Sequence, residues 1–426
     1  MAGTLKGNML IAQSGGPSMV INQSLVGAIL EARKHKQIKN IYGSLHGIKG
    51  VLEENMIDLR RESLPALEAV AQTPSSALGS VRKKPTHEEC VKIFAILRKY
   101  DIRYFFYIGG NDSAETVFII HEEARKENYD LHCFHIPKTI DNDLLENDHT
   151  PGFGSAAKFV ACALMGDNLD NRALKGVKID VIMGRHAGFL TAASALGRIY
   201  PDDGPHLVYV PERPFSMEKF CEDVRKVYER FGRCVVAVSE GISDEYGIAI
   251  ATKFIKETDS HGNVQLSGTG ALGDLLSNEI KTRLQISRVR ADTFGYLQRS
   301  FPGMVSKVDA AEAREAGARA VKEAMAGQPE GSITIRRKPG KKYKAYFERV
   351  PLQNVAKNTR HMPDEFINDA GNDVTKDFIE YARPLVGELP KIGRLKPPLQ
   401  FSRVAISRAS VAPTWPKLVP RMNSAR

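Results

Sequence analysis

The chain has 426 residues, more than the roughly 250 to 300 that one hydrophobic core usually serves, so we expect two domains. Apolar residues make up 42% and charged residues 26%, as in globular proteins, and no apolar run approaches the roughly 18 residues of a membrane span. The formal net charge of +10 favours anionic partners, but the basic residues are dispersed and lack the interleaved aromatic residues of RNA-binding motifs. We therefore expect phosphorylated small molecules as partners, and neither nucleic acid nor a membrane.

The cysteines and the first residues indicate the compartment. Five cysteines are scattered without a C-x-x-C pair, and this odd number is typical of reduced thiols. The stretch "MAGTLKGNMLIAQSGG" reaches an apolar run without the basic region and cleavage site of an export signal. We predict a cytoplasmic protein.

Short apolar runs that end in turn signals alternate with helical patterns along most of the chain. The runs lie within "NMLIAQSGGPS", "IRYFFYIGGNDS", "YDLHCFHIPKTIDND", "KIDVIMGRHAG" and "RCVVAVSEGIS". Helical patterns follow the first two runs, from about residue 19 to 34 and from about residue 113 to 128. Strands that are apolar almost throughout and are separated by helices predict parallel sheets covered on both faces. In such sheets the ligand lies beyond the carboxyl ends of the strands.

The chain changes character after about Asp309. A helix-forming stretch is followed by two strand-like runs within "SITIRRKPGKKYKAYFERVPL" and by a proline-rich tail from Pro384. We expect roughly the last 30 residues to be extended or partly disordered.

Two glycine turns are candidate phosphate sites. "SGGPS", between a strand and a helix, offers several backbone N–H groups to an anion, but it lacks the lysine of a Walker loop, and a plain tight turn is the alternative. In "GGNDS" the glycines let the backbone approach a ligand. Asn111, Asp112 and Ser113 each suit a helix N-cap, but three polar residues in a row favour a metal or phosphate contact as well.

The stretch "KTIDND" is the strongest candidate for chemistry. Asp141 and Asp143 flank Asn142 after a strand, so the two carboxylates can take different surroundings and different roles. A carboxylate beside a phosphoryl acceptor can take the hydroxyl proton as the oxygen attacks, whereas an Asx-rich turn is the structural alternative.

Later motifs supply arginines and a glutamate. "GSVRKK", "MGRHAG", "SEG" and "RADTFGYLQR" carry side chains that suit phosphate and sugar hydroxyls, although each motif alone is more often structural. "GTGALG" (268–273) matches a dinucleotide fingerprint, with Asp292 at a suitable distance. The preceding "HGNVQLS" is too polar for a central strand, so a dinucleotide-dependent dehydrogenase is a poor alternative.

Taken in order, the motifs from "SGGPS" to "GYLQR" resemble the phosphofructokinase family, and specifically its pyrophosphate-dependent branch. The resemblance implies an α/β fold with two Rossmann-like domains, mainly parallel sheets covered by helices, and an active site in the cleft between the domains. It implies a donor-binding domain at 1–150 and a sugar-phosphate-binding domain at 151–297. Residues 298–426 would return to pack on both domains and end in the proline-rich tail.

The resemblance also implies a reaction. It is the reversible, Mg²⁺-dependent transfer of phosphate from pyrophosphate to the 1-hydroxyl of fructose 6-phosphate, giving fructose 1,6-bisphosphate and phosphate. ATP as the donor, or a catalytically silent regulatory subunit, are the alternatives. A homodimer or homotetramer is implied, because Arg290 matches an arginine that reaches across from a neighbouring subunit in relatives.

Roles at the motif positions follow from the resemblance. Asp141 would accept the proton of the sugar hydroxyl, with Lys138 and Arg185 completing the catalytic set. The implied donor-binding residues are Gly15, Arg82, Asp112 and Lys138. The implied substrate-binding residues are Thr139, Ile140, Asp141, Met183, Gly184, Arg185, Glu240, Arg290, Tyr296, Leu297, Gln298 and Arg299. The implied Mg²⁺ ligands are Asn111 and Asp143.

Two of these positions predict the phosphoryl donor. ATP-dependent members carry glycine where this chain has Asp112 and Lys138. A carboxylate at Asp112 would fill the space of the ATP α-phosphate, and like charges about 4 Å apart cost on the order of 4 kcal/mol at an effective dielectric near 20. Lys138 would supply a cation to pyrophosphate. Asn111 replaces a metal-ligating aspartate of most members, so the metal contact there is through a neutral amide or a water.

Overall fold

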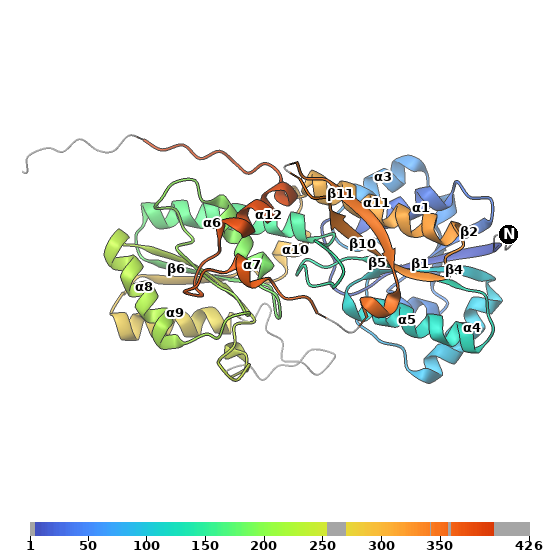
Figure 1. Ribbon diagram of the computed structural model, residues 1–426, viewed down its shortest axis with the longest axis horizontal. Helices are drawn as coiled ribbons and strands as arrows, with labels where there is room; N and C mark the ends of the chain where they lie inside the picture. Colours follow the sequence, from blue (N-terminus) through green and yellow to red (C-terminus); the bar gives the residue numbers. More distant parts are fainter. Residues whose placement is uncertain (1–4, 254–269, 341, 357–358, 396–426) are drawn as a thin grey trace, which may run out of the picture. The chain divides into compact units, whose positions relative to one another are not determined.

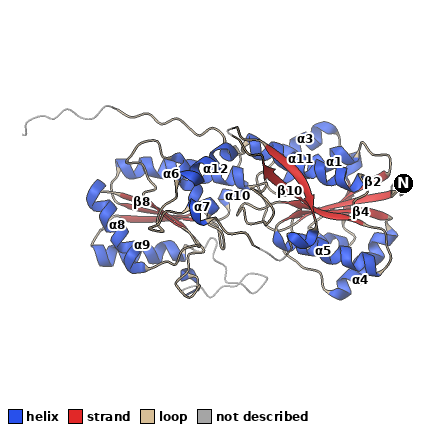
Figure 2. Ribbon diagram, in the orientation of Figure 1, coloured by secondary structure: helices blue, strands red, loops and turns tan. Residues whose placement is uncertain are grey.

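The computed structural model describes residues 5–253, 270–340, 342–356 and 359–395. Met1–Pro390 form one compact unit, which contains two β-sheets that are each covered by helices (Figure 1, Figure 2). Every described helix is too short or too polar to traverse a lipid bilayer.

The first sheet has seven strands in the order β11-β10-β5-β4-β1-β2-β3. They are β1 (Gly7–Gln13), β2 (Ile38–Ser44), β3 (Met56–Asp58), β4 (Ile102–Gly109), β5 (His132–Pro137), β10 (Glu330–Arg337) and β11 (Ala345–Val350). The inner pairs are parallel, and the edge pairs β2–β3 and β10–β11 are antiparallel. The inner strand β1 is buried along its whole length, as expected for an apolar strand with helices on both sides.

Helices cover both faces of this sheet. One face carries α1 (Ile21–Ala32), α3 (Leu64–Gln72) and α11 (Lys307–Met325). The other carries α2 (Ile48–Leu52), α4 (His87–Lys99) and α5 (Asn111–Lys126). Met9 and Ile11 of β1 pack on the first face and Leu10 and Ala12 on the second, as the pleat of a strand requires.

Helices α1 and α11 cross at two glycines. A Cβ atom at Gly27 would lie 2.1 Å from the carbonyl oxygen of Arg314, and one at Gly317 would lie 2.0 Å from that of Ser24. The two backbones are therefore in direct contact, which larger side chains would prevent. This crossing fixes part of the C-terminal segment onto the first sheet, where Figure 1 shows α11 beside α1.

The second sheet has four parallel strands in the order β7-β8-β6-β9. They are β6 (Val177–Ile182), β7 (Leu207–Tyr209), β8 (Cys234–Ser239) and β9 (Val289–Thr293). Helices α6 (Phe153–Ala173), α7 (Phe189–Ala193) and α12 (Lys376–Val386) pack on one face, and α8 (Met217–Phe231) and α9 (Ala271–Leu284) on the other. Short helices complete the described fold: α10 (Leu297–Ser300) and the 3-10 helices Leu59–Arg61, Ser194–Gly197, Ile250–Lys253, Leu352–Asn354 and Asp364–Phe366.

The two helix-covered sheets confirm the predicted α/β fold class, and the helices predicted from about residues 19 and 113 begin at Ile21 and Asn111. The C-terminal segment supplies α11, β10 and β11 to the first sheet and α12 to the second. The boundaries at residues 150 and 297 stay predictions. Residues 396–426 of the predicted extended tail, residues 268 and 269 of the dinucleotide-type match and the "HGNVQLS" before it lie outside the described residues.

Candidate active site

A cavity of about 570 Å³ opens at the carboxyl ends of strands from both sheets. Most of its lining comes from the segments that follow β1, β4 and β5 of the first sheet and β6 and β8 of the second, and residues 81–84, Arg299 and Thr359 add to it. The predicted site residues that line it are Gly15, Arg82, Asn111, Asp112, Lys138, Thr139, Ile140, Asp141, Asp143, Met183, Arg185, Glu240 and Arg299. The position beyond the strand ends is the one that the parallel topology predicts for a ligand.

The glycine turn after β1 is surrounded by cations. Gly15 has a φ of +73°, which favours glycine, and a Cβ atom there would lie 3.2 Å from the Lys138 Nζ. A Cβ atom at Gly16 would lie 3.1 Å from Arg299 Nη1 and 3.9 Å from Arg82 Nη2. Three positive side chains thus converge on one small turn, an arrangement that suits a compact anion.

Lys138 is the buried member of this group. Its side chain is 4% exposed, and its Nζ donates a hydrogen bond to the Gly16 carbonyl at 2.6 Å. Burial lowers the pKa of Lys138 to about 8, the charges of Arg299 and Arg82 add to the shift, and Asp141 and Asp143 oppose it. An anion bound among these cations would stabilise the charged form of the lysine.

The start of α5 faces the same cavity. Its N-cap is Gly110, and no side chain caps the helix, so the capping interpretation of Asn111, Asp112 and Ser113 is wrong. Ser113 Oγ instead forms a short hydrogen bond with Ser14 Oγ, which joins this helix start to the glycine turn. The positive end of the helix dipole therefore points at the same region as the three cations.

Asp141 has the surroundings of a general base. Its pKa is raised to about 7, mainly by burial and then by the negative charges of Asp143 and Glu240, while Lys138 and Arg82 oppose the shift. A carboxylate whose pKa lies near neutrality is well matched to proton transfer at that pH. Burial also raises the pKa of Asp143.

Asn111 and Asp143 form an oxygen-rich pair. Asn111 Nδ2 donates to Asp143 Oδ2 at 3.2 Å, while Asn111 Oδ1 is buried and has no hydrogen-bond partner within the described residues. An orphaned amide oxygen beside a carboxylate is a donor set that suits a hard divalent cation. Another group of carboxylates, Asp167, Asp180 and Asp292, surrounds Lys178 and does not line the cavity.

The structure changes the electrostatic argument for Asp112. Its side chain is 73% exposed, and its Oδ1 lies 3.4 Å from Nζ of Lys84, which also contacts Glu115 Oε2 at 2.6 Å. The predicted repulsion of about 4 kcal/mol is therefore too large, since solvent and a paired cation screen this carboxylate.

The sequence did not lead us to predict Lys84 as a site residue, although the basic run that follows "GSVR" was a visible signal. It also missed His186 and Thr359, which line the cavity.

Five predicted substrate residues do not line the cavity: Gly184, Arg290, Tyr296, Leu297 and Gln298. Gln298 is fully buried, accepts from the Met183 backbone N–H at 3.2 Å and donates to Gly295 O at 2.8 Å, so it holds the Met183 loop in place. Leu297 is 63% exposed. The Tyr296 ring lies 4.3 Å below the Arg299 guanidinium and so supports a cavity residue.

The other two predicted substrate residues, Arg290 and Gly184, contact other parts of the protein and not the cavity. Arg290 is exposed on the edge strand β9, where its Nη1 donates to the neighbouring Val289 O at 2.9 Å. Gly184 O accepts a hydrogen bond from Ser239 Oγ at 2.6 Å, which joins the loop after β6 to the end of β8. Contact between Arg290 and a neighbouring subunit stays a prediction.

Comparisons with known proteins agree with this geometry. The family described as Phosphofructokinase matches residues 8–324. A Rhodospirillum rubrum protein named pyrophosphate–fructose 6-phosphate 1-phosphotransferase is 58% identical over 394 residues, which cover 92% of this chain and 97% of that protein. A Xanthomonas campestris protein of the same name is 38% identical over 424 residues, covering 96% and 99%.

A solved structure gives the same result. The pyrophosphate-dependent phosphofructokinase of Marinobacter aquaeolei matches with a TM-score of 0.80 and 35% identity, over 91% of this chain and 94% of that one. The family match, the named relatives and the solved structure all indicate phosphofructokinases. The chain belongs to the phosphofructokinase family.

Proposed function

We propose that this protein catalyses the reversible, Mg²⁺-dependent transfer of phosphate from pyrophosphate to the 1-hydroxyl of fructose 6-phosphate, giving fructose 1,6-bisphosphate and phosphate. The observation that carries the proposal is the convergence of Lys138, Arg82 and Arg299 on the glycine turn, beside the carboxylate of Asp141. The names of the relatives at 58% and 38% identity support the choice of donor and acceptor.

The cationic side of the cavity suits pyrophosphate. Transfer of a phosphoryl group depends mostly on positioning and on stabilising charge, so a small donor with a high charge density needs several nearby cations. Lys138 meets this need from a buried position next to Gly16, and Arg82 and Arg299 add two further charges. Asp112 also lines this cavity and takes up space in it.

Asp141 would take the proton. The 1-hydroxyl oxygen of the sugar forms a bond to one phosphorus atom while the bond from that atom to the bridging oxygen breaks, and the leaving phosphate keeps the electron pair. The hydroxyl proton moves to the Asp141 carboxylate. Arg185 and Glu240, which line the cavity from the second sheet, would hold the sugar phosphate.

Asn111 and Asp143 would hold Mg²⁺. The buried oxygen of Asn111 and the neighbouring carboxylate fit the oxygen preference of this ion, whose other positions water and phosphate oxygens usually fill. When bound, the ion would neutralise charge on the donor oxygens.

The assembly and the location are part of the proposal. We propose a homodimer or homotetramer, because Arg290 is exposed on an edge strand and has no place in the cavity of its own chain. We propose a cytoplasmic location, since the five cysteines are unpaired and none of the described helices could cross a membrane.

Initial rates with different donors test the function. Purified full-length protein is given fructose 6-phosphate and Mg²⁺ with either pyrophosphate or ATP, and fructose 1,6-bisphosphate is measured. We expect turnover with pyrophosphate and little with ATP. Asp141→Asn should lower kcat by about 10²- to 10⁴-fold, which ties the rate to this cavity. Equal turnover with ATP would contradict the donor assignment, and no turnover with either donor would favour a silent subunit.

A further inference from the structure

The loop that carries the candidate catalytic residues lacks regular secondary structure. Residues 138–150, called the catalytic loop below, connect β5 to α6 and hold Lys138, Asp141 and Asp143. The isolated bridges Thr139–Gly152 and Leu144–Thr359 tie the loop to neighbouring backbone, and beside the second bridge the Arg360 N–H donates to Asp143 O at 2.8 Å. Asp141 takes part in neither bridge, and its N–H donates to Thr139 Oγ1 at 3.1 Å, so side chains add to this backbone contact in placing the two carboxylates.

Asn142 stands between the two carboxylates and points away from solvent. It is fully buried, does not line the cavity, and has a φ of +62°, a conformation that few residues other than glycine and asparagine adopt. Its Oδ1 accepts from the Thr150 N–H at 3.0 Å, and its Nδ2 donates to the Tyr381 hydroxyl at 2.8 Å. Asn142 therefore links the loop to itself and to helix α12.

Tyr381 is well placed to hold this contact. Its hydroxyl accepts from Asn142 and donates to Asp148 O at 2.7 Å, so both of its hydrogen-bonding roles are used within the catalytic loop. Its ring packs against Phe366 and Phe378 at centroid distances of 5.1 and 6.2 Å. The apolar packing fixes the ring, and the ring in turn fixes the hydroxyl.

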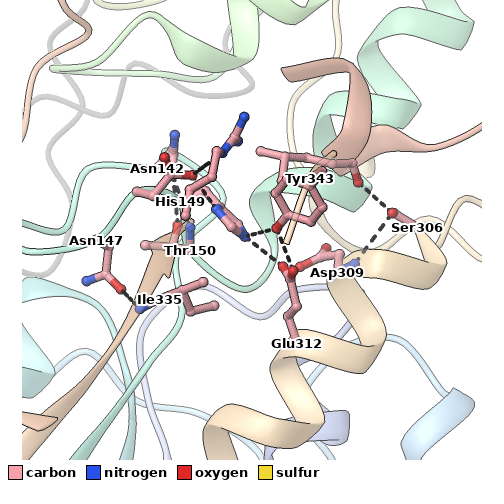
Figure 3. A network of polar contacts seen from close by, with 12 residues as sticks. Asn142, Asn147, His149, Thr150, Ser306, Asp309, Glu312, Ile335 and Tyr343 are labelled. Carbon is pink, nitrogen blue, oxygen red and sulfur yellow. Dashed lines mark hydrogen bonds and ion pairs between the residues drawn. The ribbon is translucent and has the colours of Figure 1, made fainter. Parts of the chain in front are cut away.

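A second anchor holds only the far end of the loop (Figure 3). His149 contacts Asp148 Oδ2 at 2.7 Å and Glu312 Oε2 at 2.6 Å, and the Tyr343 hydroxyl donates to Glu312 Oε1 at 2.5 Å. Glu312 belongs to α11, so this anchor joins residues 148 and 149 to the first sheet. The two anchors share Asp148, whose carbonyl oxygen accepts from the Tyr381 hydroxyl and whose carboxylate contacts His149, but the side chains of the second anchor do not contact Asn142. Tyr343 is therefore the reference for Tyr381.

We propose that Asn142 and Tyr381 form a positioning pair, through which helix α12 sets where Asp141 and Asp143 stand in the cavity. The two residues are 239 positions apart, so the C-terminal segment takes part in phosphoryl transfer without contacting the substrates. The kinetic part of this inference rests on the proposed function.

Removal of one hydroxyl tests the pair. Tyr381→Phe keeps the ring and its packing but leaves Asn142 Nδ2 without its acceptor and Asp148 O without the hydroxyl that donates to it. We expect kcat to fall by about 10- to 100-fold, because a misplaced catalytic group costs about this much, while KM for both substrates stays within a few-fold. Tyr343→Phe, which also removes a hydrogen-bonded hydroxyl from the same region, should leave kcat within about twofold. Unchanged kcat in Tyr381→Phe, or an equal loss in Tyr343→Phe, would overturn the proposal.

A double-mutant cycle tests whether the two residues act through one contact. Asn142→Gly tolerates the positive φ and removes the amide. If the pair acts as a unit, the double variant should be no slower than Asn142→Gly alone, whereas independent effects would multiply. Multiplied losses would contradict the pairing.

Hydrogen exchange separates this proposal from the proposed function. The amides of residues 139–150 should exchange faster in Tyr381→Phe than in the parent protein, with a smaller effect around Asp141 in Tyr343→Phe. If the parent protein shows no turnover, the proposed function fails, and this comparison still decides the positioning role. Unchanged exchange in Tyr381→Phe would reject it.

Discussion

The carboxylate of Asp112 is a residue whose effect depends on its neighbour. It is mostly exposed and lies beside Lys84, so it acts on a donor more by occupying space than by repelling charge. This differs from what the sequence implies, because the partner 28 positions earlier, the count 112 minus 84, becomes a neighbour only in the folded chain.

Replacement of this carboxylate should widen donor choice modestly. In Asp112→Gly we expect kcat/KM for ATP to rise by about 5- to 10-fold, since an exposed and paired charge contributes roughly 1 kcal/mol. Lys84→Met, which leaves the carboxylate unpaired, should lower kcat/KM for ATP below that of the parent protein. Steady-state rates of the three proteins with both donors provide the check. An unchanged ATP rate in Asp112→Gly would show that other residues exclude this donor.

Lys138 predicts a pH dependence on the alkaline side. Its pKa is lowered to about 8, mainly by burial, so the free protein loses this cation as the pH rises through that value. The charge that binds pyrophosphate is therefore mostly present below about pH 8 and is lost progressively above it. We therefore expect kcat/KM for pyrophosphate, which reports the free protein, to fall between about pH 7.5 and 9. Lys138→Met should be slower throughout and should lack this decline. A decline that survives in the variant would belong to another group.

At the scale of elements, the crossing of α1 and α11 depends on contact between two backbones. Gly317→Ala would place a Cβ atom 2.0 Å from Ser24 O, so the helices must separate. We expect the free energy of unfolding to fall by about 1 to 3 kcal/mol, the usual cost of overpacking.

A glycine in another helix provides the control. Gly166 of α6 is exposed, and a Cβ atom there would meet nothing within 4 Å, so Gly166→Ala should stabilise by about 0.5 to 1 kcal/mol. Thermal unfolding of both variants measures the difference. Equal melting temperatures would show that α11 can shift without cost.

The strands and loops near the site could be predicted from the sequence, whereas the side chains that hold those loops in place could not. The apolar runs of β1, β4, β5, β6 and β8 can be read from the sequence, and parallel strands place the polar residues that follow them at one edge. Gln298 was assigned to the substrate because it lies in the family motif "GYLQR", but burial with two backbone partners gives it a structural task. The contact between Asn142 and Tyr381 joins residues 239 positions apart, and no local pattern reports such a pairing.

At the scale of the whole molecule, the compact unit ends at Pro390. Removal of residues 391–426 should therefore leave the melting temperature and kcat close to those of the full chain. Truncation after Thr375 would also remove α12, whose Phe378, Leu385 and Val386 are almost completely buried. That shorter chain should unfold at a much lower temperature or without a cooperative transition. Calorimetry and rates of the two truncated proteins give the comparison, and a large loss in the longer one would assign a role to the tail.

The pairing of strands β5 and β10 has a consequence for synthesis on the ribosome. His135 of β5 contacts Ser332 of β10 across 197 positions, and all four strands of the second sheet are encoded between them. At about 5 to 20 residues per second, a nascent chain would expose the β5 edge for about 10 to 40 s before its neighbour emerges. During that interval the buried apolar face that α11 later covers would be open to solvent, and a chaperone that shields strand edges would raise the yield of folded enzyme.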